Sequence, residues 1–186
     1  MTATKPRLKS EDWIVAGFKA LSEHGPEALK AEPLARVLGT TKGSFYWHFK
    51  DVPDYHLRLL ALWEQQLSDA IDLARSEEQD PVKRLHRLGD TLHPHNALHG
   101  PATAEPAIRA WAYGFSDAAT AVQRVDQKRL SYLDETLKEL GLSNPDFKRI
   151  VYGAYIGLGS LSATDTSDDR NTLSTLLAAI LALRDA

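Results

Sequence analysis

Through residues 1–52, apolar side chains recur at three- and four-residue intervals, which is the period of an amphipathic helix. We expect Ser10 to cap a first helix and Gly25 to end it. Shorter segments at about 31–38 and 42–49 have the same period. No sustained alternation of apolar and polar positions indicates a strand. The pattern therefore predicts three helices in this part of the chain.

The remaining residues, 53–186, continue the helical pattern, with Pro and Gly placed between its segments. The expected helices lie at about 53–76, 81–92, 104–112, 115–140, 145–163 and 168–184. The sequence therefore predicts an all-α protein of about nine helices. Three of them form an N-terminal head at 1–52, and six form a body at 53–186.

The last two expected helices, at about 145–163 and 168–184, carry no charge across their central runs and are apolar on more than one side. Small residues such as Gly153 and Gly157 would let another helix approach closely. A six-helix body is too small to enclose both helices, so we expect them to form a two-fold, four-helix interface between two subunits. Tight packing within one subunit is the alternative.

Charge is divided unevenly between the two parts of the chain. Residues 1–50 hold eight Lys/Arg against five Asp/Glu, whereas residues 51–186 hold fourteen against twenty. A basic head on an acidic body is typical of a protein whose head alone meets phosphates. The sequence has no Cys, no apolar N-terminal leader and no uncharged run of the ~20 residues that a membrane span needs. We therefore expect a soluble cytoplasmic protein.

Residues 34–49 predict two short helices joined by a tight turn at Gly39, with Thr41 capping the second helix. Phe45 and Phe49 are four residues apart and share a face that can anchor this helix to a core. The side chains that point elsewhere are aromatic or basic: Lys42, Tyr46, Trp47 and His48. This arrangement is typical of a helix-turn-helix that binds DNA.

The sequence Gly-Ser-Phe-Tyr-Trp-His-Phe-Lys-Asp at 43–51, preceded by Leu-Ala-x-x-Leu-Gly at 34–39, resembles the recognition helix of the TetR family of bacterial transcriptional regulators. The resemblance covers about residues 10–60. It implies the same nine-helix architecture and a repressor that binds a palindromic double-stranded DNA operator. It also implies release by a small-molecule ligand bound in the body, with no catalytic residues and no cofactor.

The resemblance places base contacts at the start of the recognition helix and phosphate contacts further along it. It assigns base edges to Lys42, Gly43 and Ser44, and phosphates to Tyr46 and His48. By their own chemistry, Trp47 can press against a thymine methyl or the sugar-phosphate rim, and Lys50 can hold a phosphate. The alternatives are a core position for Trp47 and plain solvation for Lys42 and Lys50.

Two positions depart from the family pattern. Val52 stands where a Lys or Arg is common, which removes one expected phosphate contact. Lys30 replaces the Thr that commonly caps the second helix, and its ammonium could reach a phosphate instead. Ahead of the first helix, Lys5, Arg7 and Lys9 form a basic arm that could add affinity without sequence preference.

Aromatic and polar side chains in the body could line a ligand pocket, although an ordinary core position is the alternative for each of them. The candidates are Trp63, His86, Trp111, Tyr113, Tyr132 and Tyr155. They indicate no particular ligand beyond a bulky, partly apolar molecule.

A histidine cluster raises an alternative function. His93, His95 and His99 lie within seven residues, but Pro94 and Gly100-Pro101 indicate a loop, and no hydrolase motif accompanies them. We therefore expect no metal site. A metal-dependent enzyme on a helical bundle remains one alternative, and a partner-binding module that has lost its DNA contacts is another.

Overall fold

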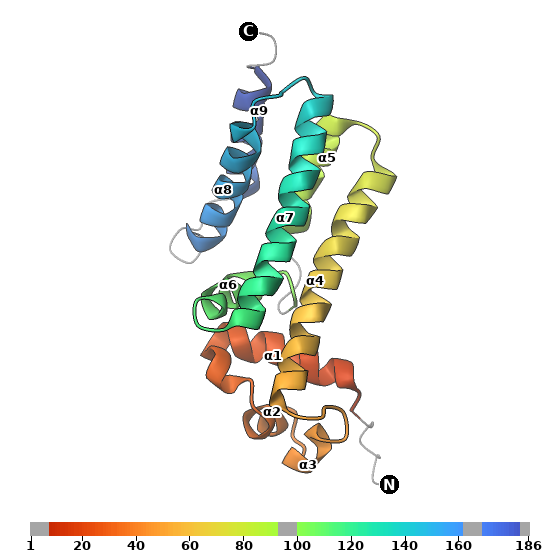
Figure 1. Cartoon of the computed structure of the whole chain (residues 1–186), viewed down its shortest axis with the longest axis vertical. Helices are drawn as coiled ribbons and strands as arrows, with labels where there is room; N and C mark the ends of the chain where they lie inside the picture. Colours follow the sequence, from red (N-terminus) through yellow and green to blue (C-terminus); the bar gives the residue numbers. More distant parts are fainter. Residues whose placement is uncertain (1–7, 93–99, 162–168, 183–186) are drawn as a thin grey trace. The chain divides into compact units, whose positions relative to one another are not determined.

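The computed structural model describes residues 8–92, 100–161 and 169–182, and within these ranges the chain forms nine α-helices, one 3-10 helix and no strand (Figure 1). The elements are α1 (Ser10–His24), η1 (Pro26–Ala28), α2 (Ala31–Val37), α3 (Lys42–Phe45), α4 (Val52–Glu77), α5 (Pro81–Leu92), α6 (Glu105–Ala112), α7 (Ser116–Glu139), α8 (Asp146–Leu161) and α9 (Asp169–Ala182). The all-α prediction is confirmed. No helix in the described ranges is long and apolar enough to cross a lipid bilayer.

The start of α1 differs from the expected one. Lys9 is the N-cap, and its backbone N–H donates to the Asp12 carboxylate at 2.7 Å. Ser10 is the first helical residue, so its predicted role as the cap is wrong. The Asp12 carboxylate in the first turn thus satisfies the backbone N–H of Lys9, and its negative charge interacts favourably with the positive end of the helix dipole. At the other end, Gly25 stops the helix with a φ of 76°, as expected.

The helix expected at 42–49 is shorter in the structure. Helix α3 ends at Phe45, and the chain continues through turns over residues 46–48. The backbone N–H groups of His48 and Phe49 both donate to the Phe45 carbonyl at 3.0 Å. The turn therefore keeps Phe45 and Phe49 on one side, although regular helix covers only four residues.

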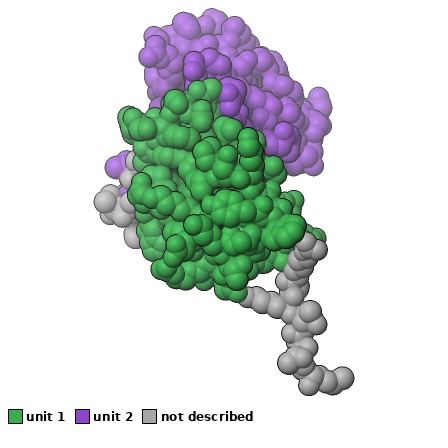
Figure 2. Space-filling view, turned by 60° about the horizontal axis from the view of Figure 1, so that its bottom comes forward, with its two compact units in different colours: residues 1–63, 96–121 green, residues 64–95, 122–186 purple. Residues whose placement is uncertain are grey.

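The chain divides into two compact units, which Figure 2 distinguishes by colour. Unit 1 comprises residues 1–63 and 96–121, and unit 2 comprises residues 64–95 and 122–186. This division passes through α4 and α7, and it groups α6 with the three N-terminal helices. The predicted boundary after residue 52 concerns a different division, between a DNA-binding part and a part for ligand binding and dimerisation. That boundary stays a prediction.

In unit 1, α1 and α4 approach closely at Gly17. A Cβ atom added to Gly17 would lie 1.8 Å from the Tyr55 hydroxyl oxygen and 2.8 Å from Leu59 Cδ1. Tyr55 is fully buried, and its hydroxyl donates to the Trp13 carbonyl at 3.0 Å. The missing side chain of Gly17 is therefore what allows α4 to reach the backbone of α1.

Unit 2 is built around α4 and α7, which run in the same direction side by side (Figure 1). Three ion pairs join them: Glu64 to Arg124, Asp72 to Lys128 and Arg75 to Glu135. Beneath these exposed pairs lies an apolar core shared with α5, α8 and α9. Because exposed ion pairs contribute little to stability, the buried apolar surface holds the unit together.

Candidate nucleic-acid interface

A tight turn joins α2 to α3 and sets the angle of the second helix. Gly39 has a φ of 61°, a left-handed conformation that glycine adopts without strain. The backbone N–H of Thr40 donates to the Ala35 carbonyl at 2.9 Å, which closes the end of α2. The Thr41 hydroxyl then accepts a hydrogen bond from the Ser44 backbone N–H at 3.4 Å. The predicted turn and its cap are both confirmed.

Phe45 and Phe49 fix this segment to the core of unit 1, as the sequence predicts. Both side chains are buried, with their ring centroids 5.0 Å apart. Phe45 packs edge-on against Trp13 of α1 at 5.4 Å, and Phe49 packs edge-on against Tyr55 of α4 at 4.9 Å. Because four aromatic side chains from three elements meet here, the orientation of α3 is set by a rigid aromatic cluster.

The other side of the same segment faces solvent. Trp47 is 84% exposed and Tyr46 is 48% exposed, so the alternative core position for Trp47 is wrong. Burial of Phe45 and Phe49 leaves the expected contact residues at or near the surface: Lys42, Gly43, Ser44, Tyr46, Trp47, His48 and Lys50. Two adjacent exposed aromatic side chains, Tyr46 and Trp47, with lysines before and after them in the sequence, are typical of a surface that contacts a partner.

The two lysines of this surface are available for phosphates. Neither Lys42 nor Lys50 forms an ion pair with any residue in the ranges that the structure describes. Asp54 lies near Lys50 but accepts from the Lys50 backbone N–H at 3.0 Å and from Arg58 Nε at 3.1 Å. These hydrogen bonds, the one from Lys50 first, lower the pKa of Asp54. The Asp54 carboxylate is therefore engaged by a backbone N–H and by Arg58, and it does not pair with the Lys50 ammonium.

Lys30 makes a different contact from the one expected. Its ammonium lies 2.6 Å from Glu27 Oε2, and its side chain provides no cap for α2. The hydrogen bond from Lys30 lowers the pKa of Glu27. Both side chains are exposed, and pairs of this kind are weak enough to rearrange when a phosphate arrives. In the basic arm, Lys9 is exposed, while Lys5 and Arg7 lie outside the described residues.

The candidate pocket residues of the body do not form one cluster in the structure. Trp63 and Trp111 are buried in unit 1, and Tyr132 and Tyr155 are buried in unit 2. Tyr113 is 96% exposed, in the loop after α6, so a pocket-lining position for it is wrong. His86 is also exposed, with Nδ1 3.4 Å from the Ser174 hydroxyl. A side chain placed by composition alone has no assigned face, which is why the prediction for Tyr113 fails, whereas the one for His86 stays a prediction.

The histidine cluster His93, His95 and His99 lies outside the described residues. Elsewhere, across residues 8–92, 100–161 and 169–182, no three His, Cys, Asp or Glu side chains are placed to hold a metal ion.

His56 is a site that sequence reasoning missed. It lies on α4, and its Nε2 is 3.0 Å from the Leu29 carbonyl, so this nitrogen carries the proton. The ring packs edge-on against Trp111 at 5.0 Å and Phe115 at 5.6 Å. These partners are far from His56 in the sequence, so no local pattern identifies them. His56 thereby ties the chain leading into α2 to the end of α6.

The position of His56 predicts a pH dependence of stability. Burial lowers its pKa below 6.5, against the opposing effects of the Leu29 carbonyl and Asp117. As the pH falls below 6.5, the unfolded chain therefore takes up a proton before the folded one, and folding is disfavoured. We expect urea unfolding between pH 7.5 and 5.5 to show a loss of stability, below about 1 kcal/mol, that His56→Gln reduces. An equal loss in both proteins would contradict this role.

Comparison with known proteins agrees with this geometry. Residues 14–51 match the model of "Bacterial regulatory proteins, tetR family". No curated protein matches the chain at the level of sequence. A transcriptional regulator from Rhodococcus sp. Rha1 has the same fold, with a TM-score of 0.76, 16% identity and 95% of each chain covered.

Two further solved structures share the fold over nearly their whole length. A TetR transcription regulator from Haloarcula marismortui has a TM-score of 0.71 and 19% identity, with 95% of this chain and 96% of that chain covered. A transcriptional regulator from Saccharomonospora viridis, solved in complex with choline, has a TM-score of 0.72 and 16% identity, with 91% and 95% covered. Residues 14–51 therefore match the helix-turn-helix of the TetR family, and the chain as a whole has the fold of solved transcriptional regulators.

Proposed function

We propose that this protein is a cytoplasmic, homodimeric transcriptional repressor that binds a palindromic operator and is released from it by a small-molecule ligand. The observation that carries the proposal is the exposed aromatic and basic surface of residues 42–50, held in place by the buried Phe45 and Phe49. A dimer would place two such surfaces in successive major grooves, about 34–36 Å apart.

The proposed roles on DNA combine what the resemblance to the TetR family implies with the chemistry and exposure of each side chain. Lys42, at the first residue of α3, donates to guanine O6 and N7, and Ser44 donates to a base or a phosphate. Gly43 lets the backbone approach the groove. Tyr46, His48 and Lys50 bind phosphates and so set the register, while Trp47 packs against a thymine methyl or the sugar-phosphate rim.

The surface of α8 supports dimerisation through α8 and α9. Ile150 is 50% exposed and Leu161 is 56% exposed, and the exposed Gly153 and Gly157 fall between them at helical spacing. A Cβ added at either glycine would meet nothing within 4 Å. These residues form an exposed apolar stripe with low relief, on which the same helix of a second subunit can pack closely.

Replacing Gly157 by glutamate tests this interface. Glutamate has a higher helix propensity than glycine and enters open space, so the subunit should fold. A charge buried between two subunits is costly, so we expect sedimentation equilibrium to find monomers and DNA affinity to fall at least about 100-fold. Gly114→Glu, at an exposed glycine outside α8, is the matched control. A dimeric Gly157→Glu protein with normal DNA affinity would contradict the interface.

Release by a small molecule is supported by two solved structures with the same fold. The Saccharomonospora viridis regulator was solved with choline bound. A structure from Bacillus halodurans is described as the fatty acid degradation regulator FadR, at 18% identity and a TM-score of 0.71. A ligand acts only through its different affinity for the DNA-binding and released conformations. Ligand-dependent loss of fluorescence anisotropy from labelled operator DNA would measure that difference.

A further inference from the structure

Two buried hydrogen-bond donors in unit 2 are left without an acceptor. Tyr132 of α7 is 1% exposed, and Arg84 of α5 is 9% exposed. Within the described part of the chain, the Tyr132 hydroxyl and the Arg84 Nε–H make no hydrogen bond of normal length. A buried polar group without a partner is costly and calls for an explanation, such as a missing ligand.

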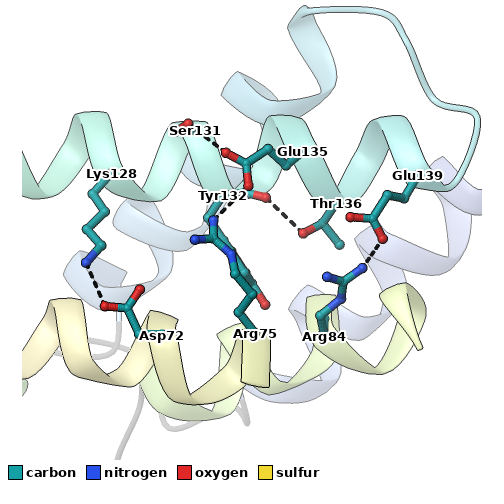
Figure 3. Close-up of polar contacts among 9 residues, drawn as sticks. All are labelled: Asp72, Arg75, Arg84, Lys128, Ser131, Tyr132, Glu135, Thr136 and Glu139. Carbon is teal, nitrogen blue, oxygen red and sulfur yellow. Dashed lines mark hydrogen bonds and ion pairs between the residues drawn. The ribbon is translucent and has the colours of Figure 1, made fainter. Parts of the chain in front are cut away.

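The neighbouring polar groups are already engaged (Figure 3). The Arg84 guanidinium pairs through Nη2 with Glu139, and Arg75 pairs with Glu135 at 2.7 Å. The Thr136 hydroxyl donates to the Tyr132 backbone carbonyl at 2.8 Å, and its weak interaction with the Tyr132 hydroxyl does not have the geometry of a hydrogen bond. No group drawn there satisfies the two donors.

Tyr132 and Arg84 lie in the same part of unit 2, because Arg84 of α5 pairs with Glu139, two turns after Tyr132 on α7 (Figure 3). Burial raises the pKa of Tyr132, and the positive charge of Arg84, followed by that of Arg75, opposes this rise. Arg75 also lies over the Tyr132 ring, 5.5 Å from its centroid. Arginines of α4 and α5 therefore lie near Tyr132, together with the Glu139 carboxylate, which adds to the rise in its pKa.

Apolar side chains also pack beside Tyr132. Tyr132 belongs to the buried core of unit 2, together with Ile71, Ala74, Leu85 and Leu133. Two donors, one of them cationic, favour a negatively charged acceptor, because charge-assisted hydrogen bonds are the stronger ones. An apolar neighbourhood favours a hydrocarbon body. The geometry thus selects an amphipathic molecule with an acidic end.

We propose that unit 2 binds the carboxylate of a small, largely apolar acid through Arg84 and Tyr132. The proposal rests on the ligand-released repressor described above and names the chemical class of its ligand. The ligand carboxylate accepts from the Tyr132 hydroxyl and from Arg84 Nε. Glu139, whose side chain is 50% exposed, can turn to solvent if the incoming carboxylate takes its place on Arg84.

Isothermal titration calorimetry of the full chain tests this site with a panel of hexanoate, octanoate, decanoate, dodecanoate and benzoate. We expect at least one of these acids to bind, and its matched alcohol to bind at least about tenfold more weakly. Tyr132→Phe and Arg84→Lys should each weaken the acid about tenfold, whereas Tyr113→Phe, at an exposed tyrosine, should not. Without ligand, Tyr132→Phe should keep or raise the melting temperature, because it removes an unsatisfied hydroxyl.

The proposal is overturned if no acid of the panel binds, if acid and alcohol bind equally, or if Tyr132→Phe leaves acid binding unchanged. Operator binding by the same preparation, followed by fluorescence anisotropy, separates this result from the proposed function. If the protein binds DNA but no acid, the proposed repressor function stands and the proposed acid-binding site is wrong. If the protein binds an acid but no DNA, the acid-binding site stands and the proposed repressor function is wrong.

Discussion

Replacing Lys42 and Lys50 together by alanine is expected to lower the affinity for operator DNA about 100-fold or more. Both ammonium groups are exposed and form no ion pair within the described residues, so each can bind DNA without breaking an internal contact. A hydrogen bond to a charged group contributes about 1.5–3 kcal/mol, and two such losses give an effect of this size. Fluorescence anisotropy at fixed salt measures it.

Lys83→Ala is the matched control, since Lys83 is an exposed lysine on α5 in unit 2 and carries the same charge. It should leave the affinity within about twofold, because the loss of one exposed charge outside the surface of residues 42–50 has only a screened effect. Equal losses in Lys83→Ala and in the double variant would mean that net charge, rather than this surface, determines DNA binding.

Gly17→Ala is expected to destabilise the folded protein by about 2 kcal/mol. The new methyl group would lie 1.8 Å from the Tyr55 hydroxyl oxygen, so α4 must move or Tyr55 must give up its hydrogen bond to Trp13. Overpacking of this kind costs about 1–3 kcal/mol, and the better helix propensity of alanine recovers at most about 1 kcal/mol. Urea unfolding followed by circular dichroism measures the change.

Gly43→Ala provides the contrast, because a Cβ there would lie 3.7 Å from the nearest atom, Thr41 Oγ1. Its stability should equal or slightly exceed that of the wild type. Adding Tyr55→Phe to Gly17→Ala should restore part of the lost stability, since it removes the atom in the closest contact. If Gly17→Ala is as stable as Gly43→Ala, the close approach of α1 and α4 at Gly17 is wrong.

The helix-turn-helix could be predicted from the sequence because its determinants are local. Gly39, Thr41, Phe45 and Phe49 lie within eleven residues, and each acts through the turn, the cap or the helix face beside it. The body helices could be predicted for the same reason, since their apolar period and their Pro and Gly boundaries are features of short windows. The structure places these helices close to their expected ranges, except that α3 ends at Phe45.

The predictions failed where residue type was the only evidence for the position of a side chain. Ser10 is a good capping residue by type, but the Asp12 carboxylate satisfies the backbone N–H of Lys9 and moves the helix start. In the same way, Tyr113 is aromatic but follows the last turn of α6, where nothing covers it among the described residues. Residue type alone does not determine which face or which turn a side chain occupies.

The contacts that sequence reasoning missed join residues far apart in the chain. Gly17 meets Tyr55, His56 meets Leu29 and Trp111, and Arg84 meets Glu139 across 55 residues. One signal was present: a glycine inside the apolar stripe of a helix often marks a close approach of another backbone or side chain. Buried arginines leave no such local signal, because their partners are brought together only by the fold.

The most direct test of the central claim is fluorescence anisotropy of the full-length protein on the DNA beside its own gene, at several salt concentrations. The account predicts that binding to one duplex exceeds binding to a scrambled one. The logarithm of the association constant should also fall linearly with the logarithm of the salt concentration. Because the two Lys50 side chains of a dimer neutralise two phosphates, the slope should be about −2 or steeper. Equal weak binding to both duplexes would place the operator elsewhere. Absence of binding even at low salt would contradict the assignment of residues 42–50 as a DNA-binding surface.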